Sequence, residues 1–220
     1  MNKILAIVFV LLLSACTTDF YETGDSPISY LRTDFVEIRT AAPTPTIFTK
    51  AITDDSDTLL LDPSIKANWA QTADSTYRAL LYYRKTALRT VTPLAINYIP
   101  VVRPTMKTNL ARFADPVTLQ SAWISKNRKY LNLGIALKTG AKANEKQKHI
   151  LGIAIDTTIH HSGNISTHKL RFFHNRNGIP AHYTSRIYLS LPLSNYHSGD
   201  TIILNIPTPV GPLVRSFPIL

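Results

Sequence analysis

The feature that most constrains the fold is a series of short segments in which apolar and polar residues alternate, separated by turn residues. In 76–85, for example, one face carries tyrosine, alanine and leucine, and the other carries two arginines. A period of two is typical of a half-buried β-strand. Since no long amphipathic helix and no internal repeat interrupts the series, the sequence predicts an all-β protein.

The first group of predicted strands is short and closely spaced. These strands cover 30–39, 46–52, 58–61, 76–85 and 94–102. Five short strands in one compact unit fit a small barrel such as an OB-fold. The sequence therefore predicts an OB-like β-domain over residues 30–102.

The second group has longer strands with turn signals between them, and it follows a proline-bounded stretch at 103–116. We expect that stretch to be a linker with room for one helical turn. The seven strands beyond it predict an antiparallel β-sandwich over 117–220, with Trp123 in its core. They cover 118–124, 129–138, 148–158, 169–175, 181–191, 201–206 and 213–219. Prolines at 207, 209, 212 and 218 would remove ladder donors, so we expect the last hairpin to form an edge.

The chain begins with a predicted lipoprotein export signal. The apolar run Ile4–Leu13 is about half the length that a helix needs to cross a bilayer, which favours a secretory signal over a membrane anchor. The residues that follow, Leu13, Ser14, Ala15 and Cys16, resemble the lipobox of bacterial lipoproteins. Small side chains admit the chain to a narrow protease site, and the Cys16 sulfur is a nucleophile that can be alkylated with diacylglycerol.

From this signal we expect residues 1–15 to be removed and acyl chains such as palmitate to anchor Cys16 in the outer membrane. Polar residues at 16–29 then form a flexible tether. The sequence leaves open whether the protein faces the periplasm or the cell surface. Cys16 is the only cysteine, so we expect no catalytic thiol, no internal disulfide and no thiolate metal site.

The chain is basic, with a formal net charge of +10. Most lysines and arginines stand singly, and only the loop 141–148 is densely basic. A basic balance is compatible with nucleic acid, anionic lipid or acidic glycan, and export makes nucleic acid the least suitable partner. A glycan, a protein or an anionic envelope component therefore remain as alternatives.

Two motifs superficially resemble chemical sites. Asp54, Asp55 and Asp57 lack the central glycine and distal glutamate of a calcium loop, and we interpret them as an ordinary turn. The segment His197–Asp200 holds the residue types of a serine triad, but triad members meet through the fold and not as neighbours in a turn.

Six of the seven histidines fall between residues 148 and 183, namely His149, His160, His161, His168, His174 and His182. In an extended strand His168 and His174 share a face with Leu170 and Phe172. No His-x-His or His-x3-His spacing occurs and carboxylates are few, so we predict no metal site and no cofactor. The same scarcity of carboxylates argues against a paired-acid hydrolase.

Aromatic residues of the first domain provide a candidate ligand face, because OB-type barrels bind oligosaccharides on such surfaces. The members of this face are Trp69, Tyr77, Tyr82, Tyr83 and Tyr98. The competing interpretation is that most of them are barrel core and wall.

Nearly the whole mature chain resembles the NigD-like lipoproteins of Bacteroidetes. The resemblance runs from the lipobox through the turn 54–57, the strand 58–61 and the strand 77–84 to three segments of the second half that match best. These are Val117–Ile124 with its Trp-Ile pair, Tyr130–Leu133, and Leu170–Asn175 with its Phe-His-Asn. The resemblance implies an N-terminal OB-like domain followed by a β-sandwich. The family name derives from a bacteriocin operon, and neither an established activity nor catalytic residues come with it.

These observations together predict a lipid-anchored, non-enzymatic binding or interaction module of the cell envelope. One alternative is a bacteriocin-associated protective or immunity protein. Two others are an envelope hydrolase and a subunit of a surface filament.

Overall fold

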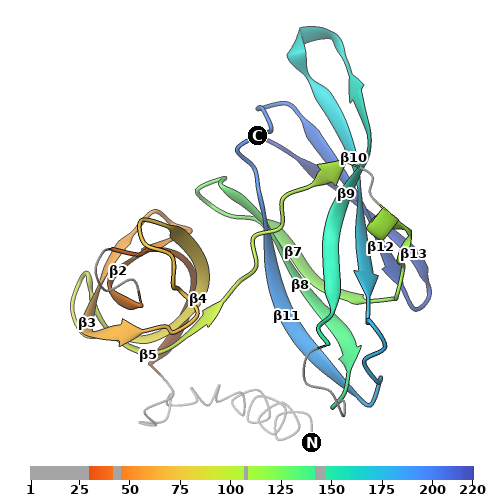
Figure 1. Cartoon of the computed structure of the whole chain (residues 1–220). Coiled ribbons are helices and arrows are strands. Elements are labelled where there is room, and N and C mark those ends of the chain that lie inside the picture. Colours follow the sequence, from red (N-terminus) through yellow and green to blue (C-terminus); the bar gives the residue numbers. More distant parts are fainter. Residues whose placement is uncertain (1–29, 42–45, 107–108, 142–146) are drawn as a thin grey trace, which may run out of the picture. The chain divides into compact units, whose positions relative to one another are not determined.

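The computed structural model describes residues 30–41, 46–106, 109–141 and 147–220 (Figure 1). The signal, Leu13, Ser14, Ala15, Cys16 and the tether lie outside the described residues. Within those described, no helix has the length and hydropathy to cross a bilayer. Residues 32–220 form one compact unit.

Five strands of the first domain close into a barrel with the order β1-β2-β3-β5-β4 (Figure 1). They are β1 (Leu31–Arg39), β2 (Ile47–Thr53), β3 (Thr58–Lys66), β4 (Thr76–Lys85) and β5 (Thr90–Tyr98). β3 and β5 are parallel, whereas β4 and β5 are antiparallel. Inward residues such as Val36, Phe48, Leu61 and Leu81 form the buried core. The predicted OB-like barrel is confirmed.

Two barrel strands have other bounds than the sequence predicted: β3 is longer, and β5 has the predicted length but is shifted four residues toward the N-terminus. β3 runs past Pro63 to Lys66, and β5 begins at Thr90, before Pro93. The β2–β3 ladder shifts register around Pro63, and the β4–β5 ladder shifts where Pro93 pairs with Tyr83. Such irregularities tolerate a residue that lacks an N–H, so the prolines do not end the strands.

The second domain is a sandwich of two sheets. One has the order β11-β8-β7 and the other β13-β12-β10-β9-β6. Short 3-10 turns cover Asn109–Arg112 (η1) and Ser162–Asn164 (η2). The strands are β6 (Thr105–Met106), β7 (Thr118–Ile124), β8 (Tyr130–Thr139), β9 (Ile150–His160), β10 (Ser166–Asn175), β11 (Tyr183–Pro192), β12 (Thr201–Thr208) and β13 (Gly211–Pro218).

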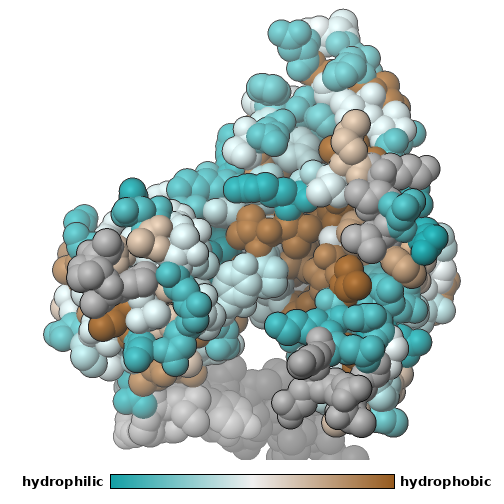
Figure 2. Space-filling model, in the orientation of Figure 1, coloured by the Kyte–Doolittle hydropathy of each residue, from teal (hydrophilic) through white to brown (hydrophobic). Residues whose placement is uncertain are grey.

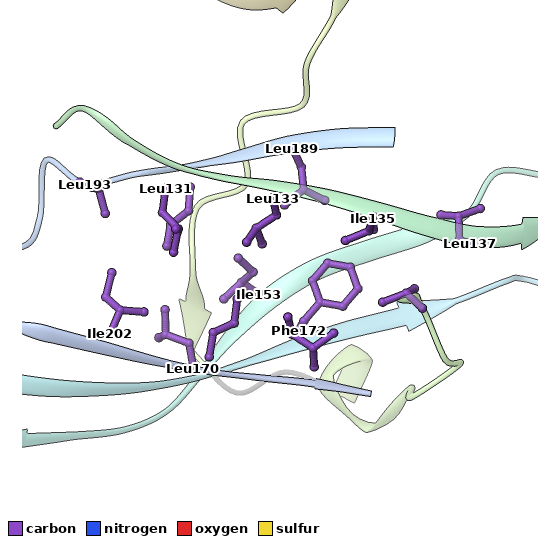
Figure 3. Packing of buried hydrophobic residues seen from close by; sticks show 14 of the residues in the cluster. Leu131, Leu133, Ile135, Leu137, Ile153, Leu170, Phe172, Leu189, Leu193 and Ile202 are labelled. Atoms are coloured by element: carbon purple, nitrogen blue, oxygen red, sulfur yellow. The ribbon is translucent and has the colours of Figure 1, made fainter. Parts of the chain in front are cut away.

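Apolar side chains from both sheets meet between them. Leu131 and Leu133 of β8 and Leu189 of β11 point toward Ile153 and Phe172 of the opposite sheet (Figure 3). All five are buried. The sandwich core therefore follows from the alternation in the sequence, with every second residue facing inward.

The sandwich departs from the prediction in two respects. It is not antiparallel throughout, because β10 pairs in parallel with β12, and β6 with β9. After β10 the chain leaves the larger sheet and forms β11 in the other sheet. It then returns to the larger sheet as β12, which runs in the same direction as β10. Trp123 is not in the core: Ala122 and Ile124 pack against the core, whereas Trp123 contacts Phe35 and Tyr188.

β13 lies at the end of its sheet, as its prolines predicted. Pro207 and Pro212 are directly opposite each other in the β12–β13 ladder, and Pro218 lies six residues further along. Hydrogen-bonded and non-bonded pairs alternate along an antiparallel ladder. Pro212 and Pro218 therefore both occupy positions whose backbone nitrogen faces away from β12.

The segment between the domains is hydrogen-bonded to the sandwich along its length. Pro100 and Val102 bond to Ser190 of β11, and β6 then pairs with β9. Further on, Asp115 bonds to His174 of β10, and Val117 to Pro207 of β12. We call residues 100–117 the strap. A predicted linker is thus a structural part of the sandwich, and its described residues 100–106 and 109–117 contact both sheets.

A buried arginine joins barrel and sandwich. The Arg78 side chain is fully buried, and its Nη2 donates to Asp54 Oδ2 at 2.6 Å and to Asn132 Oδ1 at 3.3 Å. Its Nε lies 3.4 Å from Ser190 Oγ, which donates to the same Asn132 oxygen at 2.7 Å. The guanidinium also covers the ring of Tyr130, 4.3 Å from the centroid. A buried cation requires such partners, because unpaired it would be very costly.

We predict that Arg78→Met lowers the free energy of unfolding by about 3 to 5 kcal/mol, since Asp54 is left without its cationic partner. Urea denaturation followed by tryptophan emission measures the change. The control is Lys126→Met, which breaks an exposed pair with Asp55 and is expected to cost less than about 1 kcal/mol. Equal small losses in both variants would contradict a structural role for the buried network.

Candidate functional site

Three tyrosines line a cleft of about 340 Å³ between β4, β5 and β11. Tyr82 belongs to β4, Tyr98 ends β5 and Tyr188 lies in β11. Tyr98 is 49% exposed and Tyr188 39%, so both rings are accessible from solvent. Arg186 and Asn97 add a guanidinium and an amide to the cleft wall. We call this site the tyrosine cleft.

Of the five aromatic residues predicted as a ligand face, the structure brings three together. The rings of Trp69, Tyr77 and Tyr98 form a cluster, with centroid distances of 5.6, 5.3 and 6.4 Å. Trp69 and Tyr77 pack against the barrel core, which leaves Tyr98 as the exposed member. Tyr98 therefore belongs both to this cluster and to the tyrosine cleft.

The other two predicted residues lie apart from this cluster. Tyr82 faces outward from β4 and lines the tyrosine cleft. Tyr83 is buried in the barrel and its hydroxyl donates to Asp34 at 2.5 Å. Burial first, and then the Asp34 carboxylate, raise the pKa of Tyr83 to about 12. Tyr83 is thus a core residue, which was the competing interpretation.

Tyr188 was missed by the sequence reasoning, together with the contacts that hold it. Its ring packs edge-on against Phe35 at 5.2 Å and lies 6.4 Å from Trp123. Phe35 and Trp123 are 5.2 Å apart. Aromatic pairs in this geometry add to the energy of burial, so the position of Tyr188 is fixed from behind. Because Trp69 and Trp123 both have a cleft tyrosine as neighbour, their emission can report on ligand binding.

Figure 2 shows a hydrophobic area and a hydrophilic area on one face of the molecule. Hydrophobic side chains gather over β7, β8 and β9 of the sandwich, whereas the barrel surface in this view is largely hydrophilic (Figure 2). A further hollow of about 690 Å³ lies on the barrel along β1 and β2, where Ile47 and Ile52 are exposed beside Lys50. Apolar contact surface is therefore present on both domains.

The aspartates at 54–57 form a turn, as predicted, and Asp54 has an additional role. Its carboxylate accepts from Arg78 and from Asn132 Nδ2, at 2.6 and 3.2 Å. Asp55 pairs with the exposed Lys126 at 3.1 Å. A separate hollow of about 350 Å³ includes Asp34, Asp55 and Asp57 together with Arg32 and Arg89. Among the described residues, no group of three acidic, histidine or cysteine ligands comes together to hold a metal.

Two histidines form a hydrogen-bonded pair under the strap. His174 is fully buried, and its Nδ1 donates to the carbonyl oxygen of Asp115 at 3.2 Å. Its Nε2 therefore accepts from His149 Nδ1 at 3.0 Å, and His149 Nε2 accepts from the Thr139 hydroxyl at 3.1 Å. This assignment of donors and acceptors is the one that two neutral imidazoles make, and it gives every ring nitrogen a partner.

The turn His197–Asp200 holds a buried carboxylate and no triad. Asp200 is 1% exposed and accepts from the backbone nitrogens of Ser166 and His197, at 2.7 and 2.9 Å. His168 Nε2 lies 3.2 Å from Asp200 Oδ2, the same oxygen that accepts from the His197 backbone nitrogen. Burial opposes ionisation, but these donors outweigh it and hold the pKa of Asp200 below its usual value. The sequence offered no signal for this contact, since 32 residues separate His168 from Asp200.

The family model of the NigD-like C-terminal β-sandwich domain matches residues 101–210, half of the chain. The chain belongs to the NigD-like family. This match begins in the strap and ends just before β13, which agrees with the strap being part of the sandwich. No curated protein matches the chain.

Solved structures from Bacteroides and Parabacteroides have a similar fold over most of the chain. A NigD-like immunity protein from Bacteroides caccae is 20% identical with a TM-score of 0.63, over 84% of this chain and 91% of that one. A candidate toxin-related protein from Parabacteroides distasonis is 18% identical with a TM-score of 0.58, over 85% and 92%. A candidate lipoprotein from Bacteroides fragilis is 11% identical with a TM-score of 0.55, over 85% and 96%. At these identities the likeness concerns the fold alone.

Burial lowers the pKa of both His149 and His174, and nearby Arg176 acts in the same direction. Unfolded imidazoles bind protons near pH 6.5, whereas these two bind them only at lower pH. Their contribution to stability is therefore complete above about pH 6.5 and is lost as the pH falls toward the folded-state values. We expect His149→Gln to lose less stability than the unmodified protein between about pH 6.5 and 5.

Urea denaturation at a series of pH values measures this difference. The exposed His182 provides the control, because His182→Gln should keep the pH dependence of the unmodified protein. Identical curves for the protein and for His149→Gln would show that the buried pair does not determine acid sensitivity.

Proposed function

We propose that the protein is a lipid-anchored, non-enzymatic binding module of the bacterial outer membrane, and that it holds a saccharide in the tyrosine cleft. The observation that carries this proposal is the exposure of Tyr98 and Tyr188 in one cleft, each supported from behind by other rings. Rings held in place lose little conformational entropy when they bind a ligand.

The chemistry of the cleft suits a sugar. Tyrosine offers a flat apolar face together with a hydroxyl group, and Arg186 and Asn97 add donors and an amide acceptor. A binding site of this kind is mostly apolar, with a small number of polar groups that orient the ligand. Barrels of this type bind oligosaccharides elsewhere, which supports the proposal by analogy.

We predict that a neutral linear oligosaccharide, with cellotetraose and maltotetraose as the probes, changes the tryptophan emission in a saturable manner. Loss of one ring removes about 1 kcal/mol, so Tyr98→Ala and Tyr188→Ala should each weaken binding roughly fivefold. The control is Tyr183→Ala, which removes an exposed ring from the same strand as Tyr188 but outside the cleft.

Binding that is unaffected by both cleft substitutions would place the ligand elsewhere. Absence of binding by both probes would contradict a neutral saccharide as the ligand and would favour the second function below.

The proposed anchor is testable through Cys16. We expect Cys16→Ala to abolish incorporation of labelled palmitate and to release the protein from the membrane fraction, because the thiol is the site of acylation. Lys3→Ala, in the same signal but outside the lipobox, should retain both properties. Continued membrane association of the alanine variant at position 16 would overturn the anchor.

A second candidate function is protection against a bacteriocin. The name of the Bacteroides caccae structure, a NigD-like immunity protein, favours it. The exposed Ile47 and Ile52 in the barrel hollow, beside Lys50, provide an apolar centre with a charged rim that suits a protein partner. Unchanged bacteriocin sensitivity after deletion of the gene would remove this function.

Among the described residues, two hollows hold at least two acids: one has Asp34, Asp55 and Asp57, and the other has Glu37 and Asp74. In the second, Glu37 already accepts from Lys129 and Tyr130. The first has three carboxylates. Two of these carboxylates already have partners: Asp34 accepts from the Tyr83 hydroxyl, and Asp55 pairs with Lys126. A pair of acids for glycoside cleavage requires one group that is free to protonate the leaving oxygen and one that activates water or attacks. We therefore favour binding over hydrolysis.

A further inference from the structure

A fourth hollow, of about 610 Å³, opens at one end of the sandwich. It is formed by the strap at Arg103, by β9 and β10, and by the residues that follow β11. On β10, the side chains that face the sandwich core include Phe172 and Leu170, which are apolar and buried. The next residue on this face, in the direction of the hollow, is His168. The apolar core thus ends in an imidazole, which lines the hollow.

His168 is held in a defined orientation. Its Nε2 lies 3.2 Å from Asp200 Oδ2, and its Nδ1 lies 3.4 Å from the Thr158 hydroxyl. The ring of Tyr196 packs edge-on against it at 4.8 Å. Because Asp200 itself is fixed by two backbone N–H groups, the imidazole is supported by a rigid carboxylate. An aspartate behind a histidine fixes the orientation of the ring.

The remaining walls provide donors that have no partner among the described residues. No hydrogen bond or ion pair joins the side chains of Arg103, Ser194 or Asn195 to any described residue, and all three are exposed at the hollow. The Tyr196 hydroxyl is also free of partners within the described ranges. Burial, and then the Asp200 charge, raise the pKa of Tyr196 to about 12, so this hydroxyl remains a donor.

None of the described residues that line the hollow is acidic. Asp200 lies behind His168, and its oxygens are occupied by three donors. The local charge is therefore positive, in a chain whose net charge is +10. A guanidinium binds a carboxylate through two parallel hydrogen bonds, and hydroxyl and amide groups bind sugar hydroxyls.

We propose that this hollow binds an acidic sugar, with the ligand carboxylate on Arg103 and its hydroxyl groups on Ser194, Asn195 and Tyr196. The volume lies within the range of small-molecule sites. His168 and Asp200 act as positioning residues that shape the floor of the site. The site shares no residue with the tyrosine cleft, so it does not depend on the function proposed above.

Titration calorimetry on the full chain tests the proposal with three probes. Glucuronate carries both features, glucose carries only the sugar and acetate only the carboxylate. We expect glucuronate to bind in the millimolar range, and glucose and acetate to bind at least roughly tenfold more weakly. Arg103→Gln should weaken glucuronate binding roughly tenfold, and His168→Gln should also weaken it.

Arg215→Gln is the matched control, since it removes the same charge from the exposed edge strand β13. Its affinity for glucuronate should equal that of the unmodified protein. Equal binding of glucose and glucuronate would overturn the proposed class of ligand. Equal losses of glucuronate affinity in the variants at 103 and 215 would show that only the net charge of the chain matters, which would contradict the site. Absence of glucuronate binding would refute it directly.

Discussion

The Arg78 guanidinium is buried and charged, so it requires polar partners from both domains. The position of the tyrosine cleft depends on these partners of Arg78. β4 carries Arg78, Leu80 and Tyr82 on one outward face, and the last two of these line the cleft. β11 carries Ser190, which contacts Arg78, and Tyr188, which lies two residues away in the cleft. The polar network and the cleft are therefore successive positions along the same two strands.

Much of the fold could be predicted from the sequence because burial follows alternation. The inward and outward faces of 76–85 are distributed as the period of two predicts, and the barrel and sandwich form where the spacing of the strands changes. The prolines were a weaker guide. Pro63 and Pro93 lie inside strands at register shifts, and nothing local in a sequence distinguishes such a proline from one that ends a strand.

The sites were less predictable, because they are formed by residues far apart in the chain. Asn132 and Ser190 lie 54 and 112 residues after Arg78, and Tyr188 reaches the cleft only through this pairing of strands. The sequence did place His168 in one row with Leu170 and Phe172. Nothing in the sequence indicated the contact between His168 and Asp200, because this contact depends on the parallel pairing of β10 with β12. The prediction for Trp123 was wrong because the sequence did not show that the barrel covers the outer face of β7. Trp123 points outward and packs against Phe35 of the barrel, so it is partly covered without entering the sandwich core.

The prolines of β13 have a consequence for many copies of this chain on one surface. Positions 212, 214, 216 and 218 direct their backbone toward the free edge, and prolines occupy the first and last of them. Only Val214 and Ser216 offer an N–H there, which is too few for a stable ladder with a strand of another molecule. The proposed tether to a membrane would concentrate copies of the chain in two dimensions and raise their rate of encounter. An edge that is poor in donors disfavours pairing of such copies through β13, so this edge does not join neighbouring copies into a continuous sheet.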